Sequence, residues 1–204
     1  MKQTLLIASA CAFACTPCAA IDLNYNGLSD AYESIYFDGS ADPYGDSDGD
    51  GVSNYEEMVW GTSPTDAASK VTAPVLGLTG TDLALTWYAA PYRTYELQAT
   101  TNLLTWQTLT NGAVGLYLAN LADTAPASRC FYRLLVTLNS QDSNGDGIAD
   151  WEEALWQSTY GQLPAHTDID GDGLPDNEEL LQGLAPRKKD HPAVGLVLFT
   201  PLER

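Results

Sequence analysis

The segment Asp46–Glu57 places oxygen-bearing side chains at positions 1, 3, 5, 9 and 12 of a twelve-residue loop, with a glycine at position 6. Ca²⁺ takes about six to eight oxygen ligands, and alternate residues of a tightly wound loop can supply several of them. The glycine permits the sharp turn, the backbone carbonyl of position 7 adds a ligand, and a bidentate glutamate at position 12 closes the site. The expected ligands are Asp46, Asp48, Asp50, Val52, Asn54 and Glu57.

The same pattern occurs in three further segments, so the chain holds four such loops, which we number in chain order. A single Asp- and Gly-rich match is also typical of a solvent-exposed turn. Four copies that share a glutamate at position 12 favour cation binding instead, and Ca²⁺ is the predicted cofactor. The expected ligands are Asp22, Asn24, Asn26, Leu28, Asp30 and Glu33 in loop one, Asp142, Asn144, Asp146, Ile148, Asp150 and Glu153 in loop three, and Asp168, Asp170, Asp172, Leu174, Asp176 and Glu179 in loop four.

The four loops differ in their number of carboxylates. Loop four has five at the ligand positions, loops two and three have four, and loop one has three because Asn24 and Asn26 replace aspartate. More carboxylates attract Ca²⁺ more strongly, although beyond about four their mutual repulsion counts against the calcium-free state. We therefore expect loop one to bind calcium most weakly and loop four to be among the tightest.

Negative charge is confined to the loop-bearing segments. The chain has a formal net charge of −18, but residues 21–70 hold eleven acids against Lys70, and residues 139–204 hold thirteen acids against four basic residues. Residues 71–138 hold three acids and three arginines and are neutral. Such an acidic surface repels nucleic acid and anionic lipid, and we expect no nucleic-acid partner. Acids at ligand spacing need a cation to relieve their mutual repulsion.

The first twenty residues have the features of a secretory signal peptide. Lys2 is followed by an apolar run from Leu5 to Ala14, and small residues, Cys18 and Ala20, precede the expected cleavage site. The run is too short to cross a bilayer, and no later segment is long enough. We therefore expect a secreted, periplasmic or cell-surface protein with no transmembrane segment. Lipidation at Cys11 or Cys15 is the alternative, although neither follows a Leu-rich lipobox.

Cleavage at this site leaves one of the four cysteines, Cys130, in the mature chain. No intramolecular disulfide can then form, so calcium is the available cross-link in an exported protein. Cys130 lies on the apolar face of an expected strand, which favours a buried, unreactive thiol.

Each loop leads into a short segment with apolar residues at three- and four-residue spacing, which predicts a one-sided helix. Glycine followed by proline ends this pattern after loops two, three and four. The loops differ from full helix–loop–helix EF-hands in two ways. Turn-rich segments, and not helices, precede loops two and four. Each loop also has its apolar residue at position 7, whereas EF-hands have it at position 8. This register, clearest in DIDGDGLPDNEE, resembles the thrombospondin type 3 repeat of bacterial exported proteins, as does GTSPTD after loop two. The resemblance implies that the Asp, Asn and Glu residues named above are calcium ligands.

Residues 71–138 change to a period of two. Apolar residues alternate with polar or small ones in three runs, around Leu83–Trp87, Tyr95–Ala99 and Cys130–Val136. Turn residues separate the runs, a pattern that predicts an antiparallel β-sandwich. The stretch ALTWYAAPYRTYELQATTNLLTWQTL and the later FYRLLV resemble fibronectin type III-like modules of exported bacterial proteins. The apolar tail Val194–Phe199 either supplies a final strand or covers neighbouring helices.

The expected fold is mainly β with short helices: a central antiparallel β-sandwich of fibronectin type III or immunoglobulin type, flanked by two modules of calcium loops and short helices. The expected divisions are a signal peptide at 1–20, paired loops at 21–70, the sandwich at 71–138, paired loops at 139–190 and an apolar tail at 191–204. These boundaries follow the changes in charge and periodicity.

No catalytic constellation is apparent, because the chain has only two histidines, His166 and His191, and the spacing of the loop carboxylates is already explained by ligation. We expect a calcium-binding structural or adhesive protein, acting as a spacer or surface attachment, and not an enzyme. The alternative is an accessory module that binds an extracellular protein or glycan. An exposed aromatic platform would support glycan binding, for which Trp87, Tyr92, Trp106 and Tyr117 are candidates, although each is also a candidate core residue.

Overall fold

The computed structural model of the chain describes residues 20–71, 75–79, 82–111, 117–121 and 131–189. The predicted signal peptide lies outside the described residues apart from Ala20. Cys130 and the tail at 191–204 also lie outside them.

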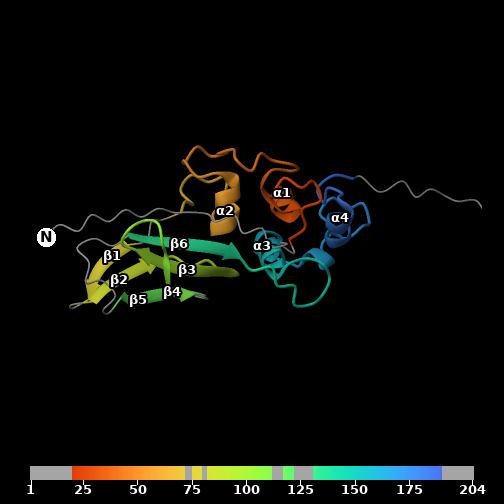
Figure 1. The fold of residues 1–204 in the computed structure, drawn as a ribbon. Coiled ribbons are helices and arrows are strands. Elements are labelled where there is room, and N and C mark those ends of the chain that lie inside the picture. Colours follow the sequence, from red (N-terminus) through yellow and green to blue (C-terminus); the bar gives the residue numbers. More distant parts are fainter. Residues whose placement is uncertain (1–19, 72–74, 80–81, 112–116, 122–130, 190–204) are drawn as a thin grey trace, which may run out of the picture.

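Every loop ends in an α-helix that begins at its ninth position. These helices are α1 (Asp30–Tyr36), α2 (Asn54–Trp60), α3 (Asp150–Tyr160) and α4 (Asp176–Gln182), and a 3-10 turn, η1 (Pro164–His166), precedes loop four (Figure 1). Positions 9 and 12 are three residues apart on a helix, so they share one face and turn toward the loop. The predicted helix ends are confirmed at Gly61, Gly161 and Gly183, where φ is 78°, 80° and 71°. Glycine adopts this left-handed conformation without steric cost.

The middle of the chain forms two three-stranded antiparallel sheets. One has the order β1 (Val75–Thr79), β2 (Asp82–Trp87), β5 (Tyr117–Leu121), and the other has the order β4 (Gln107–Asn111), β3 (Arg93–Thr100), β6 (Phe131–Leu138). The predicted alternation is confirmed where side chains are described, because Tyr95, Leu97, Leu134 and Val136 are all buried. Leu85 and Trp87 of β2 belong to the same hydrophobic cluster as these residues, so the two sheets share a core.

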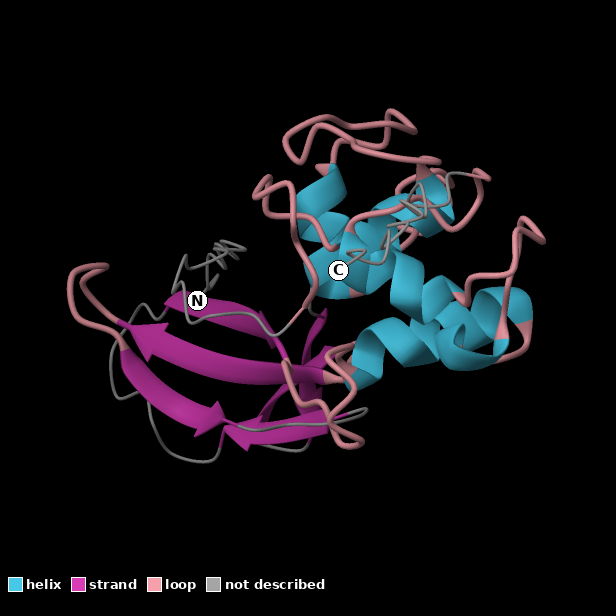
Figure 2. Ribbon diagram, turned by 90° about the vertical axis from the view of Figure 1, so that its right-hand side faces the viewer, coloured by secondary structure: helices cyan, strands magenta, loops and turns pink. Residues whose placement is uncertain are grey.

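The helices from both ends of the chain gather at one end of the sheets (Figures 1 and 2). Two hydrophobic clusters hold this helical layer together. One joins Ile21 and Ala31 to Ile148, Trp156 and Leu180, and the other joins Leu28, Tyr32 and Met58 to Ala149 and Trp151. In each cluster, residues about a hundred or more positions apart therefore pack together, an arrangement that the local patterns did not predict.

Arg93, the first residue of β3, connects the sheets to this helical layer. Its guanidinium donates to the carbonyls of Met58, Val59 and Pro91 at 2.8, 3.1 and 2.8 Å. Met58 and Val59 lie in the last turn of α2, whose carbonyls have no partner within the helix and attract positive charge. The guanidinium also lies 5.6 Å from the ring centroid of Trp151 on α3.

Candidate metal centres

In loop two, the backbone folds the carboxylates inward. Both oxygens of Asp46 accept backbone N–H groups, from Gly49 and Asp50 to Oδ1 and from Gly51 to Oδ2. One oxygen of Asp48 accepts from Asp50 at 3.1 Å, and one of Asp50 accepts from Val52 at 2.9 Å. In Asp48 and Asp50, one oxygen is fixed to the backbone in this way, and the second oxygen is left without a hydrogen bond among the described residues. Oxygens of Asp46, Asp48 and Asp50 lie within 4.8 Å of one another.

Five side-chain oxygens of loop two have no hydrogen-bond partner in the described part of the chain. Oδ2 of Asp48 and Asp50, Oδ1 of Asn54, and both Oε atoms of Glu57 are buried without a hydrogen bond among the described residues. Asn54 and Glu57 are 1% and 0% exposed. Buried charges are ordinarily paired or bound to a metal, so this set of orphaned oxygens fits a hard cation.

The electrostatics of Glu57 support the same interpretation. Burial raises the pKa of Glu57 to about 7, and the neighbouring charge of Asp48 adds to the rise. By contrast, the pKa of Asp46 is held below its ordinary value, first by the N–H of Gly51. Without a cation, part of the Glu57 population is therefore protonated at neutral pH, whereas cation binding requires the charged form.

Loop four repeats this geometry. The N–H groups of Gly171 and Gly173 donate to Asp168 at 2.8 and 3.0 Å, and oxygens of Asp168, Asp170 and Asp172 lie within 4.8 Å of one another. Oδ2 of Asp170 and Oδ2 of Asp176 are buried without a hydrogen bond among the described residues, and Glu179 is fully buried. The donor set again fits a hard cation.

Loop one is closed by amide groups instead. The Oδ1 atoms of Asn24 and Asn26 accept backbone N–H groups just as Asp48 and Asp50 do, which turns their NH₂ groups inward. These NH₂ groups donate to the two Oε atoms of Glu33 at 2.8 and 2.7 Å, and the N–H of Ala41 adds a third donor at 2.7 Å. Loops two and four contain buried oxygens without hydrogen bonds. In loop one, by contrast, amide N–H groups already donate to both carboxylate oxygens of Glu33.

Loop three is intermediate between loop one and loops two and four in how far amide groups occupy its carboxylates. Asn144 at position 3 donates to Oδ2 of Asp146 and to Oε1 of Glu153, each at 3.1 Å. Asp146 keeps aspartate at position 5, and the pKa of Glu153 is raised, first by burial and then by the charge of Asp146. One amide thus bridges two ligand carboxylates, so this loop is satisfied only in part.

In three loops the carboxylate at position 9 also accepts a hydrogen bond from a backbone N–H near the start of the loop. Asp30 accepts the N–H of Leu23, Asp150 accepts both the N–H and the hydroxyl of Ser143, and Asp176 accepts the N–H of Ile169. Asn54 in loop two donates instead to the carbonyl of Asp42 at 2.8 Å. At position 7 the side chains of Leu28 and Ile148 are fully buried, which leaves the backbone carbonyl as the group that this position can offer.

Residues 46–67 and 168–183, which contain loops two and four, match the family model of the bacterial TSP3 repeat. Both segments are similar to this repeat. TSP3 repeats are calcium-binding and typical of extracellular proteins, so the match supports calcium binding by these two loops. No curated protein and no solved structure matches the chain. In the part of the chain that the structure describes, no helix is long and apolar enough to cross a membrane.

The match agrees with the chemistry of the loops. The two TSP3-like segments are those in which three aspartate carboxylates meet. The matched segments lie outside residues 71–138, so the fibronectin type III-like character of the sheets stays a prediction.

Three residues with structural roles at these loops were not predicted. Ser53 and Glu56 form a capping box at the start of α2, a signal visible in the Ser-x-x-Glu spacing. Glu152 is fully buried next to loop three and accepts the N–H of Ala149 at 2.9 Å and the N–H of Ile21 at 3.2 Å. Burial raises the pKa of Glu152 to about 7, against the lowering effect of its hydrogen bonds.

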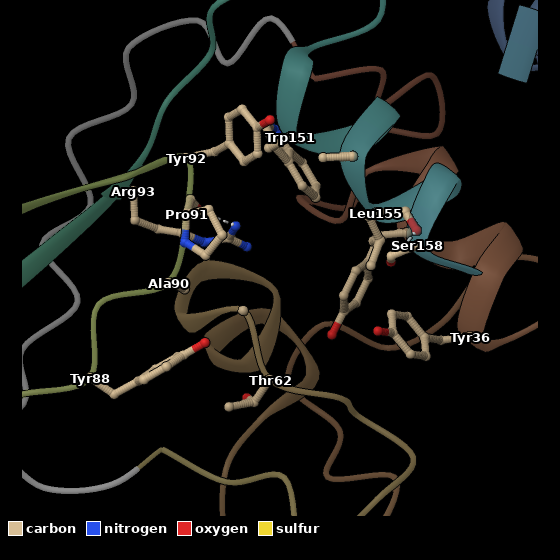
Figure 3. A pocket seen from close by; sticks show the side chains of 13 residues that line it. Tyr36, Thr62, Tyr88, Ala90, Pro91, Tyr92, Arg93, Trp151, Leu155 and Ser158 are labelled. Carbon is tan, nitrogen blue, oxygen red and sulfur yellow. Dashed lines mark hydrogen bonds between the residues drawn. The ribbon is translucent and has the colours of Figure 1, made fainter. Parts of the chain in front are cut away.

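A cavity of about 220 Å³ lies between the sheets and the helical layer (Figure 3). Its lining includes Tyr36, Tyr88, Tyr92, Arg93 and Trp151, and no Asp or Glu. Tyr92, one of the predicted platform residues, is 38% exposed and has a φ of 59°, an uncommon conformation for a bulky residue. The Nε1 of Trp151 is buried without a hydrogen-bond partner among the described residues.

The other platform candidates lie elsewhere. Trp87 is a core residue, 3% exposed. The ring of Trp106 is covered by the guanidinium of Arg133, 4.2 Å from its centroid. The side chain of Tyr117 lies outside the described part of the structure.

Proposed function

We propose that this chain is an exported calcium-binding structural protein in which Ca²⁺ at loops two and four fixes the helical layer against the sheets. The observation that carries the proposal is the set of orphaned, buried oxygens around Asp48, Asp50 and Glu57. Export, a spacer or surface-attachment role, and a fibronectin type III-like sandwich formed by the two sheets all belong to the proposal.

Calcium would act through the helices that begin in its own loops. A bidentate glutamate at position 12 ties the first turn of α2 or α4 to the loop, and the ion neutralises carboxylates that repel one another. Met58 and Val59 of α2 pack into two hydrophobic clusters, and Leu180 of α4 packs into a third. Ordering the loops therefore orders the core between both ends of the chain and the sheets.

We further propose that the protein is not an enzyme. The spacing of the loop carboxylates is explained by cation binding and needs no catalytic role. The lining of the cavity contains no histidine, carboxylate or cysteine. Hydrolysis of a glycan or peptide that stops when one acid outside the four loops is changed would overturn this part of the proposal.

Thermal unfolding of residues 21–204, with and without EDTA, tests the main proposal. Without calcium the helical layer loses its cross-links, so far-UV circular dichroism is expected to show early loss of helix, while the β signal of the neutral sheets persists. With excess Ca²⁺ restored, helix and sheet signals should again be lost together at a higher temperature, and excess Mg²⁺ serves as the control for non-specific charge screening. A melting profile unchanged by EDTA would contradict the proposal.

A second candidate function, glycan binding by an accessory module, is favoured by the cavity. A sugar ring has an apolar face that stacks on tyrosine and tryptophan side chains, and both kinds of residue line the cavity. At about 220 Å³ the cavity is smaller than the roughly 300–1,000 Å³ of drug-sized sites, which limits the occupant to about one ring.

A glycan array probed with the calcium-loaded protein tests this candidate. Tyr88, 64% exposed at the cavity, can be replaced by alanine without opening the core, and Tyr44→Ala, 76% exposed and outside the cavity, is the matched control. Binding that Tyr88→Ala removes and Tyr44→Ala keeps supports the candidate. No bound glycan, or equal loss in both variants, rejects it.

A further inference from the structure

Glu152 is a fully buried carboxylate whose described partners carry no positive charge. Its Oε1 accepts from the N–H of Ile21 and from the hydroxyl of Ser29, and its Oε2 accepts from the N–H of Ala149. Among the described residues, the lysine, arginine and histidine side chains form no ion pair with it. A buried carboxylate is costly unless an opposite charge accompanies its hydrogen bonds.

The nitrogen of Ile21 lies where that charge is needed, 3.2 Å from Oε1 of Glu152. Ile21 is the first residue after the predicted signal-peptide cleavage site. Hydrolysis there breaks the bond between the carbonyl carbon of Ala20 and the nitrogen of Ile21. Water gives its hydroxyl to Ala20 and a hydrogen to the nitrogen, which takes one further proton from solvent. At neutral pH the resulting α-amino group is largely an ammonium ion.

Ile21 is held by its own side chain and by its carbonyl, so the new amine cannot move far. Its side chain is 8% exposed and packs with Ala31, Ile148, Trp156 and Leu180. Its carbonyl accepts the N–H of Asp30 at 2.6 Å. An ammonium group at this position would replace one N–H donor by three, with the carboxylate already in reach.

We infer that removal of residues 1–20 creates an N-terminal ammonium on Ile21 that forms a buried ion pair with Glu152 and thereby fastens loop one to α3. The pair joins the start of the mature chain to α3, and it exists only in the processed chain. The precursor keeps a neutral amide at this position and holds loop one less firmly. The inference rests on the proposed export of the chain, and it does not depend on calcium.

Two chains that differ only at the N-terminus test the pair. One begins at Ile21, released from a fusion by a protease that leaves no extra residue, and the other keeps Ala19 and Ala20. In saturating Ca²⁺, the chain beginning at Ile21 is expected to melt higher by about 5 °C or more, because loss of one partner of a buried pair is costly. The comparison needs no substitution in the folded core.

Substitutions then assign the effect to Glu152. In Glu152→Gln the difference between the two chains should disappear, because the amine loses its partner charge. Glu178→Gln, an exposed glutamate at the matching third position of α4, should leave the difference intact. Equal melting of the two unsubstituted chains, or a difference that persists in Glu152→Gln, would overturn the pair.

N-terminal sequencing of the exported protein completes the test. The sequence should begin Ile-Asp-Leu-Asn-Tyr, and any other start would overturn the inference. These outcomes are separable from the calcium proposal, because the two chains are compared in the same Ca²⁺ concentration and the response to EDTA is measured independently.

Discussion

At positions 3 and 5 of each loop, the second terminal atom of the Asp or Asn side chain determines whether an oxygen or an NH₂ group faces the loop centre. In every described case the first side-chain oxygen accepts a backbone N–H two residues on, so the second atom faces inward. In aspartate that atom is an oxygen, and in Asn24 and Asn26 it is an NH₂ group that donates to Glu33. The exchange of Asp for Asn therefore replaces an oxygen that is able to bind a cation with an NH₂ group that donates to the glutamate.

This difference predicts a gain of function in loop one. The double substitution Asn24→Asp and Asn26→Asp should add one calcium site, because two inward oxygens replace two donors. Without calcium the same variant should be less stable, since the new carboxylates repel Glu33. Binding stoichiometry and thermal unfolding in EDTA measure the two effects. Asn139→Asp, an exposed change outside the loops, is the control. An unchanged stoichiometry would show that loop geometry, and not this atom, prevents binding.

The raised pKa of Glu57 predicts an unusual pH dependence. Its folded pKa of about 7 lies above the ordinary 4.5, so the folded chain binds more protons than the unfolded chain between these values. In EDTA, stability should therefore fall as pH rises from about 5 to 8.

Calcium should reverse this dependence, because it binds the deprotonated loop and competes with protons. Melting temperatures measured from pH 5 to 8, in EDTA and in excess Ca²⁺, give the two slopes. Glu57→Gln should flatten the slope in EDTA. A stability in EDTA that rises with pH across this range would contradict the role assigned to Glu57.

At the scale of elements, the helix starts and ends follow from local chemistry. Glycine and proline mark the ends, and the capping box of Ser53 and Glu56 marks the start of α2, so both were readable from spacing. The alternation around Tyr95 and Leu134 likewise identified buried faces of β3 and β6. What spacing could not identify is the partner of each face. The packing of α1 on α3 depends on contacts between distant parts of the chain, which carry no local pattern.

Among the contacts between helices and strands, we expect the loss of Arg93 to lower the free energy of unfolding most. Arg93→Ala leaves the last carbonyls of α2 without their donors, and the free energy of unfolding should fall by about 3 kcal/mol, given roughly 1.5–3 kcal/mol for a hydrogen bond to a charged group. Arg187→Ala, which removes an exposed contact to Asp38 at 3.8 Å, should cost less than about 1 kcal/mol. Urea unfolding in saturating Ca²⁺ measures both. Similar losses in the two variants would show that Arg93 does not fasten the sheets to α2.

At the scale of the whole molecule, the chain brings its two acidic ends together and leaves its neutral middle as sheets. The loop spacing predicted that aspartate oxygens come together, which the structure shows in loops two and four, while the full ligand sets stay a prediction. It did not predict that amides close loop one, because the direction of an Asn side chain is set by the backbone N–H that its oxygen accepts. Nor did it predict the aromatic cavity, whose Tyr36, Tyr88 and Trp151 come from three separate segments.

Calorimetric titration of Ca²⁺ into the chelator-treated chain of residues 21–204 measures directly whether loops two and four bind calcium. We expect at least two binding sites, of which Glu57→Gln removes or weakens one by about tenfold or more, since it loses a bidentate ligand. Glu179→Gln should do the same to a second site, and Glu33→Gln should leave both intact. The absence of calcium binding, or loss of the tightest site in Glu33→Gln, would show that loops two and four are not the calcium sites.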